Sequence, residues 1–179
     1  MAGFSLGGHS ALAISGLQVS KVKFIEYCDR NPEIWDCGWL SRGGADFSEI
    51  NVDLYDARYL DSRVSATIAI DPALAPAAII ESALGISHPV MVINFEPNEG
   101  NPEGLNAAQI TEVMPNARYK AIPQSWHFSF LPECSLLGKI VIGLGGEENI
   151  CSDWKLWDRS DVHQALINQI VPFSDESLK

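Results

Sequence analysis

The chain has 179 residues, of which 46% are hydrophobic and 20% are charged, a composition typical of a folded protein with an apolar core. Its 12 basic and 23 acidic residues give a formal net charge of −11, which argues against a nucleic-acid-binding protein and against binding to an anionic membrane. The sequence contains no apolar run of about 18 residues or more, so no transmembrane segment is expected.

The first part of the chain combines a glycine-rich turn with an irregular segment. The turn spans residues 3–8 and leads directly into an alanine-rich stretch that favours a helix. From residue 18 to residue 63 the pattern is irregular, with Asn31-Pro32 and Gly43-Gly44 as turn signals. We interpret residues 18–63 as a loop-rich insertion with short helical pieces.

The second part of the chain alternates between predicted strands and predicted helices. Short apolar, partly β-branched runs predict buried strands at 64–70 and 89–95, and a third, shorter strand is expected at 117–122. Apolar periodicity predicts a helix over 104–114 and a last, amphipathic helix over 160–171 that begins near Ser160 or Asp161. Strands that alternate with helices are typical of a parallel sheet, so we expect one α/β domain over residues 1–179.

Gly3-Phe4-Ser5-Leu6-Gly7 matches the G-x-S-x-G pattern of a nucleophile elbow, a tight turn between a strand and a helix. In such a turn the Ser5 hydroxyl projects from the edge of the sheet as a nucleophile, and the Leu6 backbone N–H points to the position of an oxyanion. We expect glycine at positions 3 and 7 because backbone segments pass closely there. The alternative for the pentapeptide alone is an ordinary glycine–serine loop before a helix.

An aspartate and a histidine follow in the order that a Ser-Asp-His triad has in α/β-hydrolases. Asp71 stands directly after the strand predicted at 64–70, and His127 lies in a loop soon after the strand predicted at 117–122. The carboxyl ends of parallel strands meet at one edge of a sheet, so these side chains can meet there. The sequence therefore predicts Ser5 as nucleophile, His127 as general base and Asp71 as the acid that orients the imidazole.

The remaining histidines, tryptophans and acidic residues are expected to have structural roles. His9 lies one helical turn after Ser5 and is expected to pack or to support the site, with the base role as the alternative. His88 is expected in a surface loop, and His163 on the last helix. Packing in the core, in a lid or around an acyl pocket is expected for Trp35, Trp39, Trp126, Trp154 and Trp157. Without a turn glycine and a terminal glutamate, no calcium loop or other metal site is expected from Asp153, Asp158 and Asp161.

The four cysteines fall into two local pairs, Cys28 with Cys37 and Cys134 with Cys151. Neither spacing matches the short C-x-x-C arms of a zinc site, and no histidine lies at ligand spacing from them. We therefore predict two local disulfides, which form in an oxidising compartment. The alternative is four buried free thiols in a cytosolic protein.

Four segments resemble a known group of proteins. They are Gly3–Gly8, Ala69–Ala73, Val92–Glu96 and Trp126–Leu131, and they are similar to α/β-hydrolases of the dienelactone-hydrolase-like group and the neighbouring platelet-activating-factor acetylhydrolase group. The resemblance runs from Gly3 through the last helix. It implies an α/β-hydrolase fold, hydrolysis of a small-molecule carboxylic ester by a serine, and no cofactor.

The resemblance also bears on the acid and on the nucleophile. In the acetylhydrolase group the acid follows the first strand after the elbow, which here gives Asp71. In many other α/β-hydrolases the acid follows the next strand, where this chain has Asn98, flanked by Glu96 and Glu99 as alternates. Dienelactone hydrolases proper use a cysteine nucleophile, so Ser5 favours ester hydrolysis over lactone-specific chemistry.

Hydrolases of this kind place several strands and an oxyanion loop before the nucleophile, whereas only four residues precede Ser5 here. We therefore expect this chain to be the C-terminal part of an α/β-hydrolase fold, with the N-terminal strands missing. A periplasmic or secreted location is expected for the full-length form. The alternative function is a catalytically inactive remnant that lacks the upstream strands and the second oxyanion donor.

Overall fold

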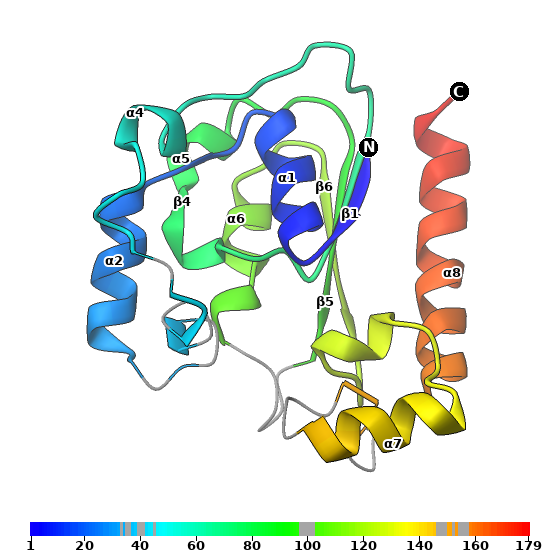
Figure 1. Cartoon of the computed structure of the whole chain (residues 1–179). Coiled ribbons are helices and arrows are strands. Elements are labelled where there is room, and N and C mark those ends of the chain that lie inside the picture. The colour runs from blue at the N-terminus through cyan, green and yellow to red at the C-terminus, as the bar shows by residue number, and fades with distance from the viewer. Residues whose placement is uncertain are drawn as a thin grey trace.

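The computed structural model describes residues 1–32, 34, 37–38, 42–44, 46–96, 103–145, 150–151, 153 and 158–179. A four-stranded sheet with the order β1-β3-β5-β6 forms its centre, and every neighbouring pair of these strands is parallel (Figure 1). The strands are β1 (Ala2–Phe4), β3 (Thr67–Ile70), β5 (Val90–Phe95) and β6 (Ala117–Ile122). The predicted α/β class with a parallel sheet is confirmed, in a Rossmann-like arrangement.

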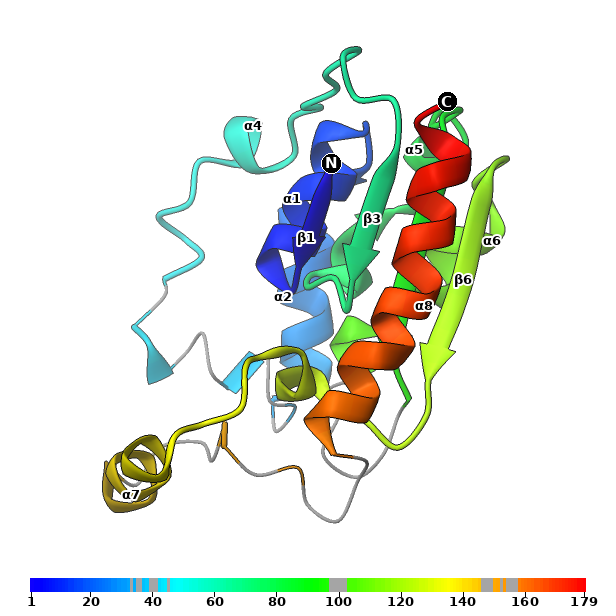
Figure 2. The same ribbon diagram turned by 90° about the vertical axis from the view of Figure 1, so that its right-hand side faces the viewer.

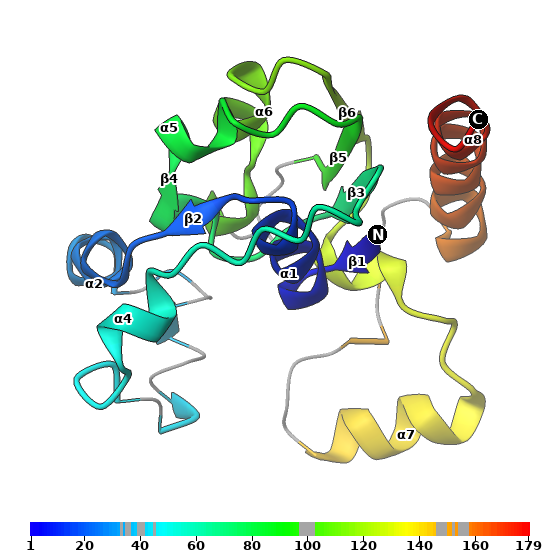
Figure 3. The ribbon, with the colours of Figure 1, turned by 90° about the horizontal axis from the view of Figure 1, so that it is seen from above.

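Helices cover both faces of this sheet (Figure 2). Along one face lies α8 (Arg159–Ser177), and on the other lie α1 (Leu6–Ile14) and α6 (Ala108–Glu112). Figure 3, seen from above, separates these layers clearly. The described residues also contain the helices α2 (Lys21–Arg30), α4 (Val52–Tyr55), α5 (Ile80–Ala83) and α7 (Leu136–Gly145). Short 3-10 helices in the same part of the chain are η1 (Ala75–Ala77), η2 (Glu103–Leu105) and η3 (His127–Phe130).

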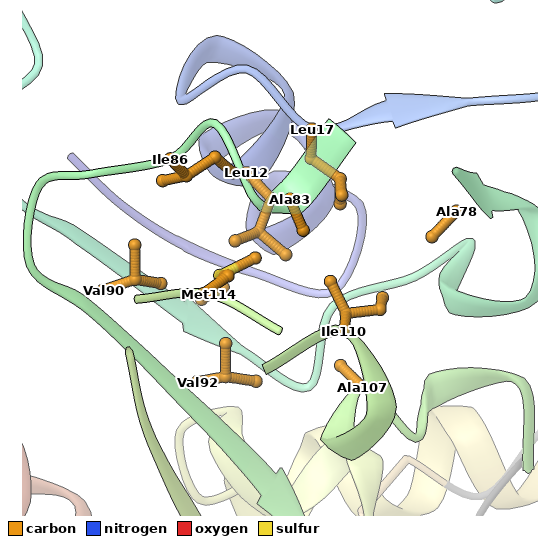
Figure 4. Close-up of a cluster of buried hydrophobic side chains, with 11 residues drawn as sticks. Leu12, Leu17, Ala78, Ala83, Ile86, Val90, Val92, Ala107, Ile110 and Met114 are labelled. Carbon is orange, nitrogen blue, oxygen red and sulfur yellow. The ribbon is translucent and has the colours of Figure 1, made fainter. Parts of the chain in front are cut away.

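Two apolar cores lie on the two faces of the sheet because successive strand residues point to opposite sides. In β5, Val90 and Val92 belong to the core beneath α1 and α6, which Figure 4 shows in close-up. The intervening Met91 and Ile93 pack in the other core, against α8. Every residue of β5 is buried, which is the expected property of a strand covered on both faces.

The predicted strand at 117–122 is confirmed to the residue, and the other two predicted strands are each shorter by up to three residues at their beginning. The predicted helix at 104–114 is wrong in extent. The chain forms η2, then a break, and then the five residues of α6. The break coincides with hydrogen bonds from this segment to the side chain of Asn94, which replace the helical pattern there.

The last helix is longer than predicted and begins slightly earlier. Asp158 is its N-cap residue, and Ser160 and Asp161, near which the helix is predicted to begin, lie in its first turn. The helix also continues through Pro172, where a helix loses a hydrogen bond at a cost of about 3 kcal/mol. The next residue, Phe173, is 1% exposed and packs in the core between the sheet and α8, which stabilises this part of the helix.

The segment at 18–63 is more regular than predicted at its beginning. It contains the ten-residue α2, and the short strand β2 (Gln18–Val19) pairs with β4 (Ala78–Ile79) in an antiparallel ribbon. Phe24 of α2 is buried in a small third core with Val19 and Ala77. The beginning of this segment, β2 and α2, therefore packs against β4 and η1.

Both predicted disulfides are present. Cys28 is bonded to Cys37 and Cys134 to Cys151, with S–S distances of 2.10 and 2.09 Å. No cysteine is free, so the alternative of four free thiols is wrong. The two bridges are compatible with an extracellular location. Within the described residues, no helix combines the length and apolar character needed to cross a membrane.

The helix α7 is the least expected element, and it stands away from the sheet and its covering helices in Figures 2 and 3. It lies at the end of the molecule to which the strands point. Its outward surface is an apolar stripe of side chains that are 50–83% exposed: Leu136, Leu137, Ile140, Val141 and Leu144. Gly138 and Ile142, on its inner side, are half-buried.

Candidate active site

The strained turn predicted at Ser5 is present. β1 ends at Phe4 and α1 begins at Leu6, and Ser5 between them has φ 56° and ψ −123°. Its N–H donates to the carbonyl of Ile70 at 2.9 Å, which fixes the turn to the end of β3. A positive φ is unusual for a residue with a side chain and is often found at functional sites.

Close backbone contacts around Ser5 occur at Gly3 and Gly8, whereas the sequence pattern predicts them at Gly3 and Gly7. A Cβ on Gly3 would lie 2.0 Å from the Gly7 carbonyl oxygen, so glycine is required at position 3 as expected. A Cβ on Gly7 would meet nothing within 4 Å, so the predicted requirement there is wrong. The second close approach is at Gly8, whose Cβ would lie 3.1 Å from the Ile70 carbonyl oxygen. The glycine that permits α1 to pack against β3 is therefore Gly8.

Asp71 occupies the position directly after β3 and is 2% exposed. Its φ is 45°, and its N–H donates to the Ile93 carbonyl at 2.6 Å. Its Oδ1 accepts hydrogen bonds from the Asn94 side-chain amide at 2.8 Å and from the Phe95 N–H at 3.1 Å. These donors leave Oδ2 to the next residue of the predicted triad.

His127, the first residue of η3, lies between the other two predicted triad residues. Its Nδ1 is 2.7 Å from Asp71 Oδ2, and its Nε2 is 3.0 Å from Ser5 Oγ. An ionised carboxylate only accepts hydrogen bonds, so it assigns the proton of the neutral imidazole to Nδ1. Nε2 then accepts from the Ser5 hydroxyl, which is the polarity that a general base requires.

Aromatic rings hold the imidazole in this position. The Phe4 ring lies 4.6 Å from the His127 ring, centroid to centroid, and stacks on Phe130 at 4.2 Å. The side chains of His127 and Asp71 are 4% and 3% exposed. The pair is thus shielded from water. In this buried environment the electrostatic attraction between the two side chains is stronger than it would be at an exposed surface.

A polar network behind His127 fixes the segment that carries it. Asp153 Oδ1 accepts hydrogen bonds from Trp126 Nε1 and Ser129 Oγ, each at 3.0 Å, and Arg159 Nε lies 2.9 Å from Asp153 Oδ2. The Arg159 guanidinium also donates to the carbonyls of Leu131, Pro132 and Ile150. Arg159 is 3% exposed. Through these hydrogen bonds the buried cation connects the start of α8 to the loop that carries His127, called the histidine loop below.

The backbone at the start of α1 can serve as an oxyanion donor. Leu6 is the first residue of α1, and the first N–H groups of a helix have no partner within it. The positive end of the helix dipole lies at the same place. The Leu6 N–H therefore fits the predicted role of stabilising negative charge next to Ser5. This role involves the backbone of Leu6 and not its side chain, and the residue is 61% exposed.

Other candidate residues lie apart from the triad or have structural partners. His9 is half-buried on α1, and burial lowers its pKa, but the imidazole next to the Ser5 hydroxyl is that of His127. His88 is not simply a surface residue, since its Nε2 is 3.0 Å from Thr67 Oγ1. His163 Nε2 contacts the Phe130 carbonyl at 3.1 Å, as expected of a structural residue.

Among the alternates for the acid and the tryptophans, the described residues are Glu96 and Trp126. Glu96 follows β5 and is exposed, whereas Asp71 contacts His127. Trp126, which directly precedes His127 in the chain, is buried. Outside the described residues lie Asn98, Glu99, Trp35, Trp39, Trp154 and Trp157.

Sequence reasoning missed Asn94, Asp153 and Arg159. A signal was present for Asn94, because it is the one polar residue in an otherwise apolar predicted strand. No local signal marked the pair of Asp153 and Arg159, whose role depends on distant backbone carbonyls.

The described residues contain no group of three or more His, Cys, Asp or Glu side chains placed to hold a metal ion. Comparisons of the chain with protein-family models, with curated proteins and with solved structures found no match. What this site can do is therefore judged from its geometry and its chemistry. That geometry joins a hydroxyl, an imidazole and a carboxylate in one hydrogen-bonded series.

Proposed function

We propose that the chain is a serine hydrolase that cleaves carboxylic esters through an acyl-enzyme intermediate. The observation that carries the proposal is the hydrogen-bonded series from Ser5 Oγ through His127 to Asp71, with distances of 3.0 and 2.7 Å. Two further features support it. Ser5 has the backbone conformation of an elbow, and the pair of His127 and Asp71 is buried.

In the first half of the reaction, Ser5 Oγ forms a bond to the carbonyl carbon of the ester while His127 Nε2 takes the hydroxyl proton. The carbonyl oxygen becomes an oxyanion, to which the Leu6 N–H donates. The intermediate collapses, the bond to the alcohol breaks, and the leaving alcohol takes the proton from His127. Asp71 holds the imidazole in its tautomer and stabilises the imidazolium.

In the second half, water attacks the acyl carbon and gives a proton to His127 Nε2. The bond between Ser5 Oγ and the acyl group breaks, the carboxylic acid leaves, and Ser5 recovers its proton from His127. The side chains supply the nucleophile, the base and the acid, so this chemistry requires no cofactor. The proposed substrate is a small-molecule ester, and the two disulfides support a periplasmic or secreted location.

The test is covalent labelling of the chain with a fluorophosphonate probe, which reacts with activated serines. We expect the wild-type chain to be labelled and the Ser5→Ala variant to remain unlabelled. The matched control is Ser10→Ala. Ser10 lies on α1, and its exposed hydroxyl donates to the Leu6 carbonyl. Equal labelling of the Ser5→Ala variant would overturn the proposal, and no labelling of the wild type would favour a catalytically inactive chain.

A further inference from the structure

The side chain of Asn94 occupies a fully hydrogen-bonded position beside the proposed catalytic acid. Asn94 lies in β5 and is 3% exposed. Its Nδ2 donates to Asp71 Oδ1 at 2.8 Å and to the Leu105 carbonyl at 2.7 Å, and its Oδ1 accepts from the Ala107 N–H at 3.0 Å. The orientation of the amide is determined, because a flipped amide would place its oxygen against two acceptors.

The hydrogen-bond donors and acceptor of an amide match the groups around position 94. The Nδ2 group carries two N–H donors, so it serves Asp71 and Leu105 at the same time. An aspartate in the same place would have no donor when ionised, and only one when protonated. Asn94 therefore differs from Asp by the ability to satisfy two acceptors at once.

We infer that Asn94 is a positioning residue that holds the Asp71 carboxylate in the orientation in which Oδ2 accepts from His127. This inference rests on the proposed function. The amide of Asn94 and the Phe95 N–H both donate to Oδ1, which prevents rotation of the carboxylate about its side-chain bond. Because Asn94 is itself fixed by Leu105 and Ala107, the segment after η2 is coupled to the site.

Loss of the Asn94 amide is expected to shift the protonation of His127 in one direction. Without the donor, more negative charge remains on the Asp71 carboxylate, and this favours the protonated form of His127, which cannot act as a base. The Asn94→Asp variant adds a carboxyl group and shifts the equilibrium in the same direction. Tyr119 and Glu96 are the neighbouring titratable groups that interact with this region, and both stay in place in the variants.

The experiment measures the rate of fluorophosphonate labelling against pH for the wild type, Asn94→Asp and Asn94→Ala, normalised to the number of labelled sites at completion. We expect both variants to react about 10- to 100-fold more slowly, the range for a lost hydrogen bond to a charged group. We also expect the acidic midpoint of the rate profile to move to higher pH. Asn116→Asp is the matched control, because Asn116 is exposed and donates to the Ser87 carbonyl away from the site.

A merely structural role would lower the number of labelled sites without moving the pH midpoint. Rates and midpoints equal to those of the wild type would overturn the inference and leave the proposed function standing. If the wild type is not labelled, the proposed function fails, and the inference is then decided by NMR. We expect the proton resonance of His127 Nδ1–H, hydrogen-bonded to Asp71, to shift or disappear in both Asn94 variants and not in Asn116→Asp. An unchanged resonance would overturn it.

Discussion

Ser5 and Asp71 hold equivalent positions on two paired parallel strands. The last residues of these strands, Phe4 and Ile70, are partners in the sheet register, so the two residues that follow them leave the sheet side by side. Both have a positive φ, 56° at Ser5 and 45° at Asp71. The same edge of the sheet thus turns two side chains out of the strand direction and toward His127.

The first prediction concerns Asp71, whose carboxylate fixes the tautomer of His127. An amide at this position can donate to Nδ1 and so favours the tautomer in which Nε2 carries the proton and cannot accept it. We expect Asp71→Asn to lower turnover of a small ester by about 10⁴-fold. Steady-state kinetics on the purified variants provide the measurement.

The control for Asp71 is the exposed Glu96, one of the two alternates for the acid. We expect Glu96→Gln to change turnover only mildly, and we expect the same of Glu99→Gln. A crippled Glu99→Gln variant together with an active Asp71→Asn variant would show that the acid is assigned to the wrong residue.

The second prediction separates the glycines of the elbow. A methyl group at position 3 would overlap the backbone carbonyl of Gly7, which cannot move away without breaking the turn. We expect Gly3→Ala to destabilise the fold by roughly 3 kcal/mol or more. Gly7→Ala meets open space in a helix and is expected to be neutral or to stabilise by up to about 1 kcal/mol. Thermal unfolding followed by circular dichroism distinguishes the two, and similar losses in both variants would contradict the prediction.

The third prediction is that both disulfides form in the purified chain, with the pairing of Cys28 to Cys37 and Cys134 to Cys151. In the chain-entropy description, bridges that close loops with sequence separations of 9 and 17 contribute about 2.5–3 kcal/mol each. Intact-mass measurement after alkylation under denaturing conditions without reductant should find no reactive thiol. Four alkylated thiols before reduction would refute the bridges, and peptide mapping would reveal any exchange of partners.

The fourth prediction concerns the buried salt bridge of Asp153 and Arg159. Removal of one partner leaves a buried charge without compensation, and this typically costs about 3–5 kcal/mol. Asp153→Ala is therefore expected to destabilise the chain and to slow labelling at Ser5, because the histidine loop loses its anchor. The double variant Asp153→Ala/Arg159→Met should recover part of the stability, as a denaturant titration can measure. A double variant no more stable than Asp153→Ala would contradict this prediction.

The fifth prediction is a dependence of stability on pH through His9. Burial lowers the pKa of His9 below its ordinary value of 6.5, so the folded chain binds fewer protons than the unfolded chain at mildly acidic pH. The contribution of His9 to stability is fully present at pH values above its pKa in the unfolded chain, and it is lost as the pH falls below that pKa. The free energy of unfolding in urea should be measured at about pH 7.5 and at about pH 5.5. We expect its difference between the two pH values to be smaller for His9→Gln than for the wild type. An equal difference would exclude His9 as a source, and burial also lowers the pKa of His88, which contributes in the same direction.

The arrangement of Ser5, Asp71 and His127 could be predicted from the sequence because each residue sits at a local signal. A glycine-rich turn marks Ser5, a buried apolar strand comes before Asp71, and the strand Ala117–Ile122 comes before His127 in the chain. A parallel sheet then brings such positions to one edge without any knowledge of the loops. Their proximity in space follows from the class of fold, whereas their catalytic roles remain predictions.

The partners of the site could not be predicted in the same way, because they depend on register and on distant carbonyl groups. Asn94 reaches Asp71 only because Ile70 pairs with Ile93 in the sheet, which places the next residues of both strands together. The mistaken requirement for glycine at position 7 has a similar origin. The close contact is made by Gly8 with the end of β3, which no local pattern reveals.

The apolar stripe on α7 has a consequence for how the chain behaves in solution. Five aliphatic side chains face water, and exposed apolar patches of this kind promote association between molecules. The formal net charge of −11 opposes that association by mutual repulsion at low ionic strength. Added salt screens the repulsion without weakening apolar contacts, so the colloidal stability of the chain is expected to fall as ionic strength rises.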